Sequence, residues 1–414
     1  MMQASVISSA RQTASNSVVA DSEASTLVRV ITTVSDLESV RNVWDALRTA
    51  TDVPAISSDP DRFMATINAT AQSTVPHVVV IGPAENPTAM LVGRSLRHRS
   101  RCRIGYVHIP TPKLRCLMIA HGGVMTNGDH ESIRQIVQYF DTQEVIDKFD
   151  LVLVNKLSQG HPAMPVITAL PRAIRREVRT HWVTDLVPGS FEKSMSWHNR
   201  KHRSQLRRRD KKLCEYFDGV LELKCYEHIE HIDAVLDAVA AIWPKTYKAG
   251  LNLERPDSVT SRATYAKAAT QGKMLCYVLY GRGSPIAYQL GVRTGNWYHA
   301  ESTAYLPEYR SLAPGKCLLI RVFQDLCERG VEIFDWGFGD AEDKRIYGTR
   351  SWDEANINIY GRSIAATYTR YVDVFCEWAK RFVARHLSRY ARSKIKTRWR
   401  KRLERKSNIE TTLE

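Results

Sequence analysis

Hydrophobic residues in this chain follow two periods, one typical of strands and one typical of helices. Residues 297–304 (WYHAESTA) have the aromatic and β-branched content of a strand. After a loop at 306–314, hydrophobic residues recur at helical spacing over 318–326 (LLIRVFQDL). This pattern stops at Arg329-Gly330, a basic last turn followed by glycine, and residues 331–336 (VEIFDW) predict a second strand. The expected unit is therefore strand, loop, helix, strand.

The same order of elements is found in the first half of the chain. Strands expected at 76–81 and 88–94, joined by GPAENP, correspond to strands expected at 274–280 and 286–293, joined by GRGSP. The apolar segment 149–155 (FDLVLVN) corresponds to 331–336. We interpret this order as a weak internal duplication, although any two α/β domains share strand pairs and helices. The pattern predicts an α/β protein with mixed sheets.

The start of the helix after residue 313 has the features of an anion site. Pro314-Gly315 places no bulky side chain beside the first turn, where unpaired N–H groups and the helix dipole attract negative charge. Arg310 and Lys316 add positive charge there, so a pyrophosphate would fit. Pro and Gly are also common in ordinary turns between a strand and a helix, and the turn alone does not exclude that interpretation. The corresponding turn in the first half, Asn127-Gly128-Asp129, places an acid where a phosphate would lie, which is repulsive.

Four segments of the second half are informative as an ordered set: RKHRSQLRRRDKKL (200–213), SPIAYQLG (284–291), AYLPEYRSLAPG (304–315) and FDWGFGDAEDKRIYG (334–348). In their order and spacing they resemble the GNAT-type acetyltransferases of the cellulose-biosynthesis (CelD/BcsL-like) family. The same region is similar, more distantly, to the FemAB-like aminoacyltransferases. Where the family carries Tyr-Lys after Gly-Asp-Ala, this chain has Asp343-Lys344. If the family's tyrosine donates a proton, Tyr347 is the candidate to replace it in this chain.

The resemblance implies tandem GNAT-like acyl-CoA N-acyltransferase domains in a FemAB-like arrangement. The expected divisions are a disordered tail at 1–25, a first GNAT-like domain at 26–186 without the phosphate-binding turn, and a GNAT acetyltransferase domain at 187–365. Residues 366–414 form an expected basic amphipathic helix. The resemblance also implies acetyl-CoA or another acyl-CoA as cosubstrate, and a role in bacterial polysaccharide or envelope metabolism.

Acyl transfer from a thioester needs a phosphate cradle, a polarised carbonyl and a base for the acceptor's proton. The predicted cofactor-binding cradle consists of Tyr309, Arg310, Ser311, Leu312, Ala313, Pro314, Gly315, Lys316 and Cys317. The candidate catalytic residues are His299, Glu301, Asp335, Lys344 and Tyr347. For His299 and Glu301, a structural role as a surface or hydrogen-bonded residue is the favoured alternative. The sequence has neither a Ser-His-Asp order nor a GxSxG elbow, so a covalent serine mechanism is not expected.

Composition limits the location of the protein and the cofactors that it can bind. The eight cysteines include no CxxC pair and no His/Cys cluster, which predicts neither a disulfide framework nor a metal site and fits a reducing cytoplasm. No apolar run approaches the roughly 20 residues of a membrane span. The N-terminal residues lack the apolar core of a signal peptide, and we expect a cytoplasmic protein.

The net charge of +15 is concentrated in two segments. Residues 198–212 carry eight Lys or Arg and one Asp, and residues 380–406 carry thirteen Lys or Arg and one Glu. The rest of the chain is slightly acidic, which argues against a nucleic-acid coat. The first segment could bind an anionic acceptor or a carrier phosphate, or it could be a solvated helix face with Leu206 and Leu213 packed inward.

The second basic segment has a hydrophobic stripe at nearly helical spacing: Val383, Leu387, Ala391, Ile395, Trp399 and Leu403. Such a helix suits an anionic membrane surface, here the inner membrane face. A helix that packs its stripe on its own protein is the alternative.

The sequence leaves three functions open. The first is an acyl-CoA-dependent N- or O-acyltransferase that acts on a polysaccharide-related or small amino or hydroxyl acceptor. The second is a FemAB-like aminoacyltransferase that uses aminoacyl-tRNA, for which the basic helices fit but no aromatic stacking motif is present. The third is a non-catalytic binding protein that keeps the fold, which the Asp343 departure favours.

Overall fold

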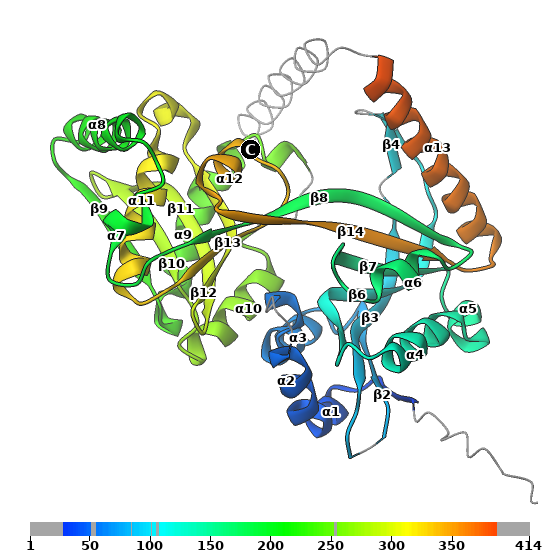
Figure 1. Cartoon of the computed structure of the whole chain (residues 1–414). Coiled ribbons are helices and arrows are strands. Elements are labelled where there is room, and N and C mark those ends of the chain that lie inside the picture. The colour runs from blue at the N-terminus through cyan, green and yellow to red at the C-terminus, as the bar shows by residue number, and fades with distance from the viewer. Residues whose placement is uncertain are drawn as a thin grey trace, which may run out of the picture.

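A single twelve-stranded sheet runs through the computed structural model, which describes residues 28–50, 55–83, 85–100, 102–104, 107–251 and 255–386 (Figure 1). In sheet order the strands are β1 (Val28–Ile31), β2 (Thr74–Ile81), β3 (Ala89–Arg99), β6 (Lys113–Thr126), β7 (Leu151–Ser158), β14 (Arg350–Tyr360), β8 (Ala173–Asp185), β13 (Ile333–Phe338), β12 (Trp297–Tyr305), β11 (Ser284–Thr294), β10 (Cys276–Gly281) and β9 (Leu221–Tyr226). The short strands β4 (Cys102–Ile104) and β5 (Val107–Ile109) form a separate antiparallel pair.

The strand order is symmetric about the middle of the sheet. Each half has a meander that leads into one parallel pair, β6 with β7 in the first half and β12 with β13 in the second. The two central strands are exchanged. β14 belongs to the second half in sequence but pairs with β7, and β8 belongs to the first half but pairs with β13. The long β8 and β14 pair with each other and cross the middle of Figure 1, so backbone hydrogen bonds join the halves. The predicted mixed α/β fold is confirmed.

Helices cover both faces of the first half of the sheet. On one face, α1 (Val34–Leu37), η1 (Glu38–Val40), α2 (Arg41–Thr49) and α3 (Pro60–Ala69) bury a core around Trp44 and Phe63. On the other face, α4 (His130–Asp141), α5 (Gln143–Lys148) and α6 (Met164–Thr168) pack around Ile136 and Phe140. Alternating residues of one strand enter the two cores, as Val78 and Val79 do, because side chains of a strand point to opposite faces.

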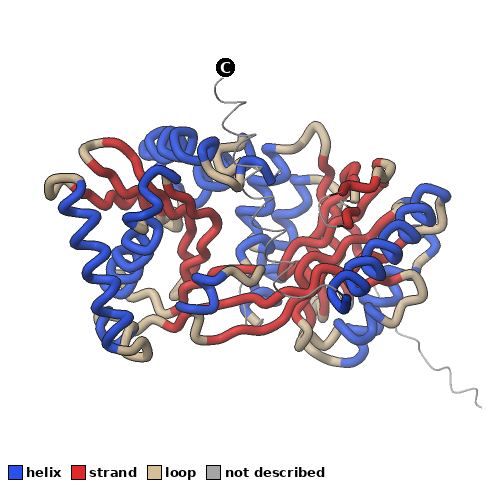
Figure 2. Tube along the Cα trace, turned by 90° about the horizontal axis from the view of Figure 1, so that it is seen from above, coloured by secondary structure: helices blue, strands red, loops and turns tan. Residues whose placement is uncertain are grey.

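A larger core holds the second half together. Its helices are α7 (Phe191–Ser194), α8 (Arg200–Tyr216), α9 (Ile232–Ile242), α10 (Val259–Thr270), α11 (Pro314–Glu328) and α12 (Glu342–Tyr347). This half also has the 3-10 turns η3 (Ile229–His231), η4 (Trp243–Lys245), η5 (Ala249–Leu251) and η6 (Pro307–Leu312), whereas η2 (Ile56–Ser58) lies in the first half. Tyr277, Tyr298 and Phe323 are fully buried in this core. Figure 2 shows the strands crossing between two groups of helices.

The last helix of the described chain, α13 (Ile364–His386), returns to the first half and packs there through a polar centre. The buried Asp373 carboxylate accepts hydrogen bonds from Arg176 at 2.5 Å, Asn358 at 3.1 Å and the Cys102 thiol at 2.7 Å, and also from the Tyr360 hydroxyl. Of the hydrophobic stripe predicted in the tail, Val383 lies in α13 but its side chain is outside the described residues, as are the other five positions.

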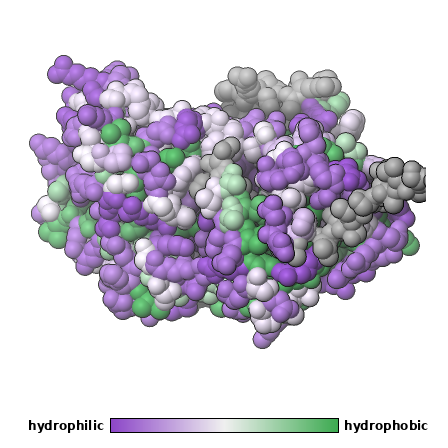
Figure 3. All heavy atoms as spheres, turned by 60° about the horizontal axis from the view of Figure 1, so that its bottom comes forward, coloured by the Kyte–Doolittle hydropathy of each residue, from purple (hydrophilic) through white to green (hydrophobic). Residues whose placement is uncertain are grey.

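No helix within the described ranges is long and apolar enough to span a bilayer. Seen with the lower side of Figure 1 turned forward, the surface is mostly hydrophilic and its hydrophobic residues form small groups (Figure 3).

We predict that Asp373→Ala lowers the free energy of unfolding by about 3–5 kcal/mol, because the buried Arg176 guanidinium loses its main partner. Glu131→Ala is the control, since its ion pair with Arg134 is exposed to solvent and should contribute little to stability. Urea unfolding measures both variants, and equal losses would contradict a structural role for Asp373.

Candidate active site

The second parallel strand pair opens shortly after it forms. β12 and β13 pair at only three positions, which end with His299 opposite Asp335. β12 then continues to Tyr305 along β11, with an irregularity in register opposite Leu290 and Gly291, while β13 continues to Phe338 along β8. The two strands therefore part directly after His299 and Asp335, and these residues stand at the apex of the opening.

His299 and Asp335 form a buried hydrogen-bonded pair. Nδ1 of His299 lies 2.9 Å from Oδ2 of Asp335, and the residues are 2% and 8% exposed. Burial alone would raise the pKa of Asp335, but hydrogen bonds from His181 and His299 outweigh it and hold that pKa well below its usual range. When Nδ1 donates to the carboxylate, Nε2 of His299 carries the lone pair, and this buried atom has no hydrogen-bond partner among the described residues. The arrangement is that of an imidazole base oriented by a carboxylate.

The same carboxylate also contacts the first half of the chain. Oδ1 of Asp335 lies 2.6 Å from Nε2 of His181 on β8. Beyond His181 lie Glu354 on β14 and His121 on β6. Burial lowers the pKa of His181, but its two carboxylate neighbours, Asp335 and Glu354, more than compensate and raise it to about 9. The pKa of Glu354 falls to about 2, because the neighbouring His121 and His181 outweigh the effect of burial.

Sequence reasoning missed His121, His181 and Glu354. They lie on three strands far apart in the chain, and no motif contains them. The one local signal is that His181 and Val183 are two residues apart on a strand, so their side chains point to the same face. The structure shows both buried, which places a titratable side chain in the core.

The other predicted catalytic residues have separate environments. The ammonium group of Lys344 donates to the carbonyl groups of Trp336, Gly337 and Phe338 at 2.6, 3.0 and 3.2 Å, so it holds the end of β13. Burial lowers the pKa of Lys344 to about 8. Glu301 forms an ion pair with Arg62 of α3 at 2.5 Å and is thus paired with the first half.

Tyr347 is the last residue of α12. It is fully buried, and its hydroxyl has no hydrogen-bond partner among the described residues. Its ring lies beside those of His198 and His202, at 5.2 and 5.7 Å between centroids. Burial raises the pKa of Tyr347 above its usual value, so the group is protonated and able to donate.

The predicted cradle forms the turn from η6 into α11. Ala313 takes a left-handed conformation with φ of 54°, and no side chain caps the first turn of α11. Arg310 and Ser311 are exposed, and Lys316 lies 3.8 Å from Asp343. Leu312, Pro314 and Cys317 are buried, Tyr309 packs on Phe217, and Gly315 faces the Tyr305 ring, where a Cβ atom would approach to 3.0 Å. The backbone, Arg310, Ser311 and Lys316 are therefore the parts of this turn that can reach an anion.

The corresponding helix of the first half is closed to such a ligand. Asp129 caps α4, and its carboxylate accepts a hydrogen bond from the backbone N–H of Ser132 at 2.5 Å. The chain's own carboxylate thus occupies the place where an anion would bind.

The basic helix α8 packs against α11 through its apolar side. Leu206 and Leu213 are buried as expected, and Asp210 pairs with Arg321 of α11 at 3.0 Å. Seven of the eight Lys and Arg residues of α8 are exposed, and Arg203 is half-buried; the exposed ones are Arg200, Lys201, Arg207, Arg208, Arg209, Lys211 and Lys212.

Residues 200–345 match the family model described as an acetyltransferase (GNAT) domain. The match includes α8, the opening between β12 and β13, and the α11 turn, and it supports a transferase of the GNAT type. No curated protein matches the sequence.

Three solved structures that are similar to this chain cover four fifths of it or more. The FemX structure has a TM-score of 0.56 at 9% identity, covering 83% of this chain and 100% of its own. A tandem GNAT protein from the clavulanic acid biosynthesis pathway has a TM-score of 0.47 at 10% identity, covering 81% and 100%. The L-PGS structure from Bacillus licheniformis has a TM-score of 0.46 at 12% identity, covering 80% and 95%. At such identities the FemX likeness shows a shared fold, and it agrees with the predicted tandem arrangement.

Proposed function

We propose that this protein is an acyl-CoA-dependent acyltransferase that transfers an acyl group, acetyl in the simplest case, to an amine or hydroxyl. The observation that carries the proposal is Nε2 of His299, which is buried at the point where β12 and β13 part and has no hydrogen-bond partner in the described part of the chain. The GNAT match of residues 200–345 supports it, because GNAT domains use acyl-CoA as cosubstrate.

His299 acts as the general base in this proposal. Its Nε2 accepts the proton of the acceptor's amine or hydroxyl as that group attacks the acyl carbonyl, and Asp335 stabilises the imidazolium that forms. Tyr347 is the candidate for returning a proton to the leaving thiolate, since its hydroxyl is protonated and has no hydrogen-bond partner among the residues that the structure describes. Lys344 positions the end of β13, and Glu301 fixes β12 against α3.

The described residues fit the phosphates of acyl-CoA at one place. The first turn of α11 lacks a side-chain cap and is flanked by Arg310 and Lys316, whereas Asp129 closes the equivalent turn of α4. We therefore propose one acyl-CoA per chain, held by the second half. Asp343, where the resembling family has tyrosine, lies 3.8 Å from Lys316, and its negative charge partly offsets the positive charge of this site.

The resemblance to CelD/BcsL-like proteins supports an acceptor in bacterial polysaccharide or envelope metabolism. FemAB-like transfer from aminoacyl-tRNA is the second candidate, favoured by the FemX-like fold and by the exposed basic face of α8. A thermal-shift assay with acetyl-CoA and with aminoacyl-tRNA separates the two candidates, because only the cosubstrate that the protein binds raises its unfolding midpoint. A non-catalytic protein would bind an acyl-CoA without turnover.

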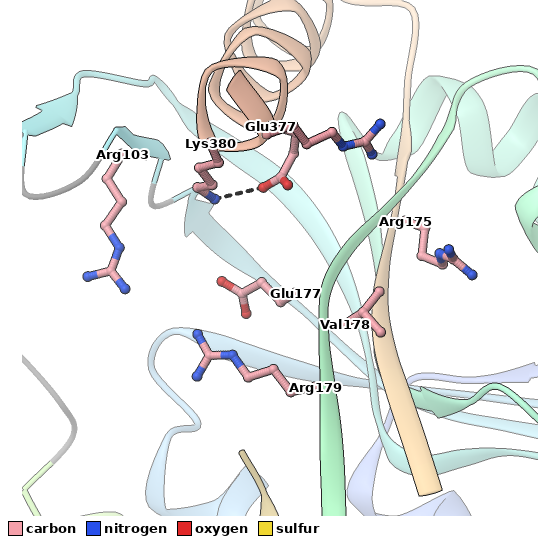
Figure 4. Close-up of a pocket in the computed structure, with 8 residues that line it drawn as sticks. Arg103, Arg175, Glu177, Val178, Arg179, Glu377 and Lys380 are labelled. Atoms are coloured by element: carbon pink, nitrogen blue, oxygen red, sulfur yellow. Dashed lines mark hydrogen bonds and ion pairs between the residues drawn. The ribbon is translucent and has the colours of Figure 1, made fainter. Parts of the chain in front are cut away.

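We also propose a peripheral site on an anionic membrane surface, on the cytoplasmic side. The outer face of α13 exposes Tyr371, Phe375 and Trp378, at 65%, 51% and 59%. Beside it lies a hollow of about 430 Å³ lined by Arg103, Arg175, Glu177, Val178, Arg179, Glu377, Lys380 and Arg381. Figure 4 shows Arg103, Glu177, Arg179 and Lys380 bordering this space next to α13. Interfacial aromatic rings beside a surplus of cations suit phospholipid head groups.

His299→Ala should lower the turnover rate by about 10²–10⁴-fold and leave the affinity for acetyl-CoA unchanged, because it removes only the proton acceptor. Turnover is measured with an acceptor found by intact-mass screening, and affinity by calorimetry. His161→Ala is the control, an imidazole of the first half that contacts the Val124 carbonyl. Wild-type turnover in His299→Ala would refute the base assignment.

Lys316→Glu should weaken acetyl-CoA binding at least about tenfold, because a carboxylate replaces an ammonium beside the phosphates. Lys113→Glu makes the same charge change at an exposed position of the first half and should bind normally. Calorimetry gives affinity and stoichiometry together. Two equivalent sites per chain, or equal affinity in both variants, would contradict the α11 site.

Replacing Tyr371 and Trp378 together by Ser should abolish salt-sensitive co-sedimentation with phosphatidylglycerol vesicles and spare acetyl-CoA binding. Val259→Ser removes a 74% exposed apolar side chain on α10 and should leave sedimentation unchanged. If wild-type protein ignores these vesicles at low salt, α13 does not serve as a membrane surface.

A further inference from the structure

A cluster of metal-binding side-chain types lies next to the His299–Asp335 pair, on the far side of Asp335. It consists of His121 on β6, His181 on β8 and Glu354 on β14, and one ligand atom from each lies within 4.8 Å of the others. The side chains of His181 and Glu354 are 1% and 2% exposed, and that of His121 is 14% exposed. The cluster is therefore shielded from solvent.

The distances within the cluster are close to those between ligands of one ion. Nδ1 of His181 lies 2.9 Å from Oε1 of Glu354, and Nε2 of His121 lies 3.3 Å from the same oxygen. Ligand atoms bound to a tetrahedral zinc ion at about 2.0–2.2 Å stand roughly 3.3–3.6 Å apart. Small side-chain adjustments would thus place all three around one cation.

Two buried polar atoms of this cluster lack a hydrogen-bond partner among the described residues. They are Nδ1 of His181 and Oε2 of Glu354. The 2.9 Å contact between His181 and Glu354 does not have the direction of a hydrogen bond. Nε2 of His181 donates its proton to Asp335, so Nδ1 is the ring nitrogen that lies against the Glu354 carboxylate. Because the pKa of His181 is about 9, Nδ1 carries a proton at neutral pH in the absence of a metal, and a divalent cation bound between Nδ1 and the carboxylate would take the place of that proton.

The surroundings of the cluster are those of a metal site. A metal-binding histidine usually donates its other N–H to a carboxylate, and Asp335 accepts from Nε2 of His181 at 2.6 Å. Trp352 stacks on His181 with ring centroids 4.4 Å apart, and its indole N–H donates to Oε1 of Glu354 at 2.9 Å. Both ligands are thereby held in their present rotamers.

We propose that His121, His181 and Glu354 bind one divalent transition-metal ion, with zinc the ion that best suits two imidazoles and a carboxylate. The ion joins three strands of the sheet, including the exchanged pair β8 and β14, and fixes Asp335 through His181. The expectation of no metal site rested on spacing along the sequence, and these ligands meet only through strand pairing. The proposal is independent of the acyltransferase assignment.

The test uses full-length protein stripped with a chelator and then titrated with Co²⁺ and with Zn²⁺. We expect one equivalent of either ion per chain, visible absorption bands of low-symmetry Co²⁺ with nitrogen and oxygen ligands, and a higher unfolding midpoint with Zn²⁺. His121→Ala and Glu354→Gln should each weaken binding by at least about tenfold. His161→Ala, which removes an imidazole outside the cluster, should bind like wild type.

A protonated His181 held between two carboxylates without a metal is the competing explanation. In that case stripped wild-type protein takes up no stoichiometric ion, or His121→Ala binds as well as wild type, and either result overturns the proposal. Circular dichroism of each variant confirms that it is folded. Glu354→Gln is nearly isosteric, so it tests the site even if His121→Ala does not fold.

Discussion

The Asp335 carboxylate is the interaction on which the centre of this protein depends. One oxygen accepts from His299 and the other from His181, so a single side chain links the second half of the chain to the first. A buried charge of this kind is stable only if its partners stay in place, because loss of one partner leaves an uncompensated carboxylate. The surrounding backbone must therefore hold three strands, β12, β13 and β8, in one register.

The exchange of β8 and β14 provides that register. β13 would be an edge strand of its own half without β8, and β7 would be one without β14. The exchange removes both edges and lines up Asp335, His181 and Glu354 on neighbouring strands. It also explains why a division of the chain after residue 186 separates elements that are adjacent in space. The candidate site lies at the junction because the junction supplies polar groups from both halves.

The two halves share an element order but differ at the positions that carry chemistry. Asp129 closes the first turn of α4, whereas the first turn of α11 has Ala313 in a left-handed conformation and no cap. In the first half, η2 packs against β6, where a Cβ atom at Gly122 would lie 2.5 Å from that of Ala55. The first turn of α11 thus stays without a side-chain cap, while that of α4 is filled by its own chain, and the first half contributes Arg62, His121 and His181 to the centre.

The sequence by itself determined the local elements of this protein. The period of hydrophobic residues is a property of neighbouring positions, so it predicted the unit from β12 through α11 to β13, the inward face of α8 with Leu206 and Leu213, and the α11 turn. His299 was a candidate from its place on the predicted strand, and Asp335 from the motif of the resembling family; the two lie on adjacent strands of that unit. Only the tertiary structure decided that Glu301 pairs with Arg62, that Tyr347 faces His198, and that His121, His181 and Glu354 meet. These contacts join segments far apart in sequence, and the register of the exchanged strands, which no local pattern encodes, brings them together.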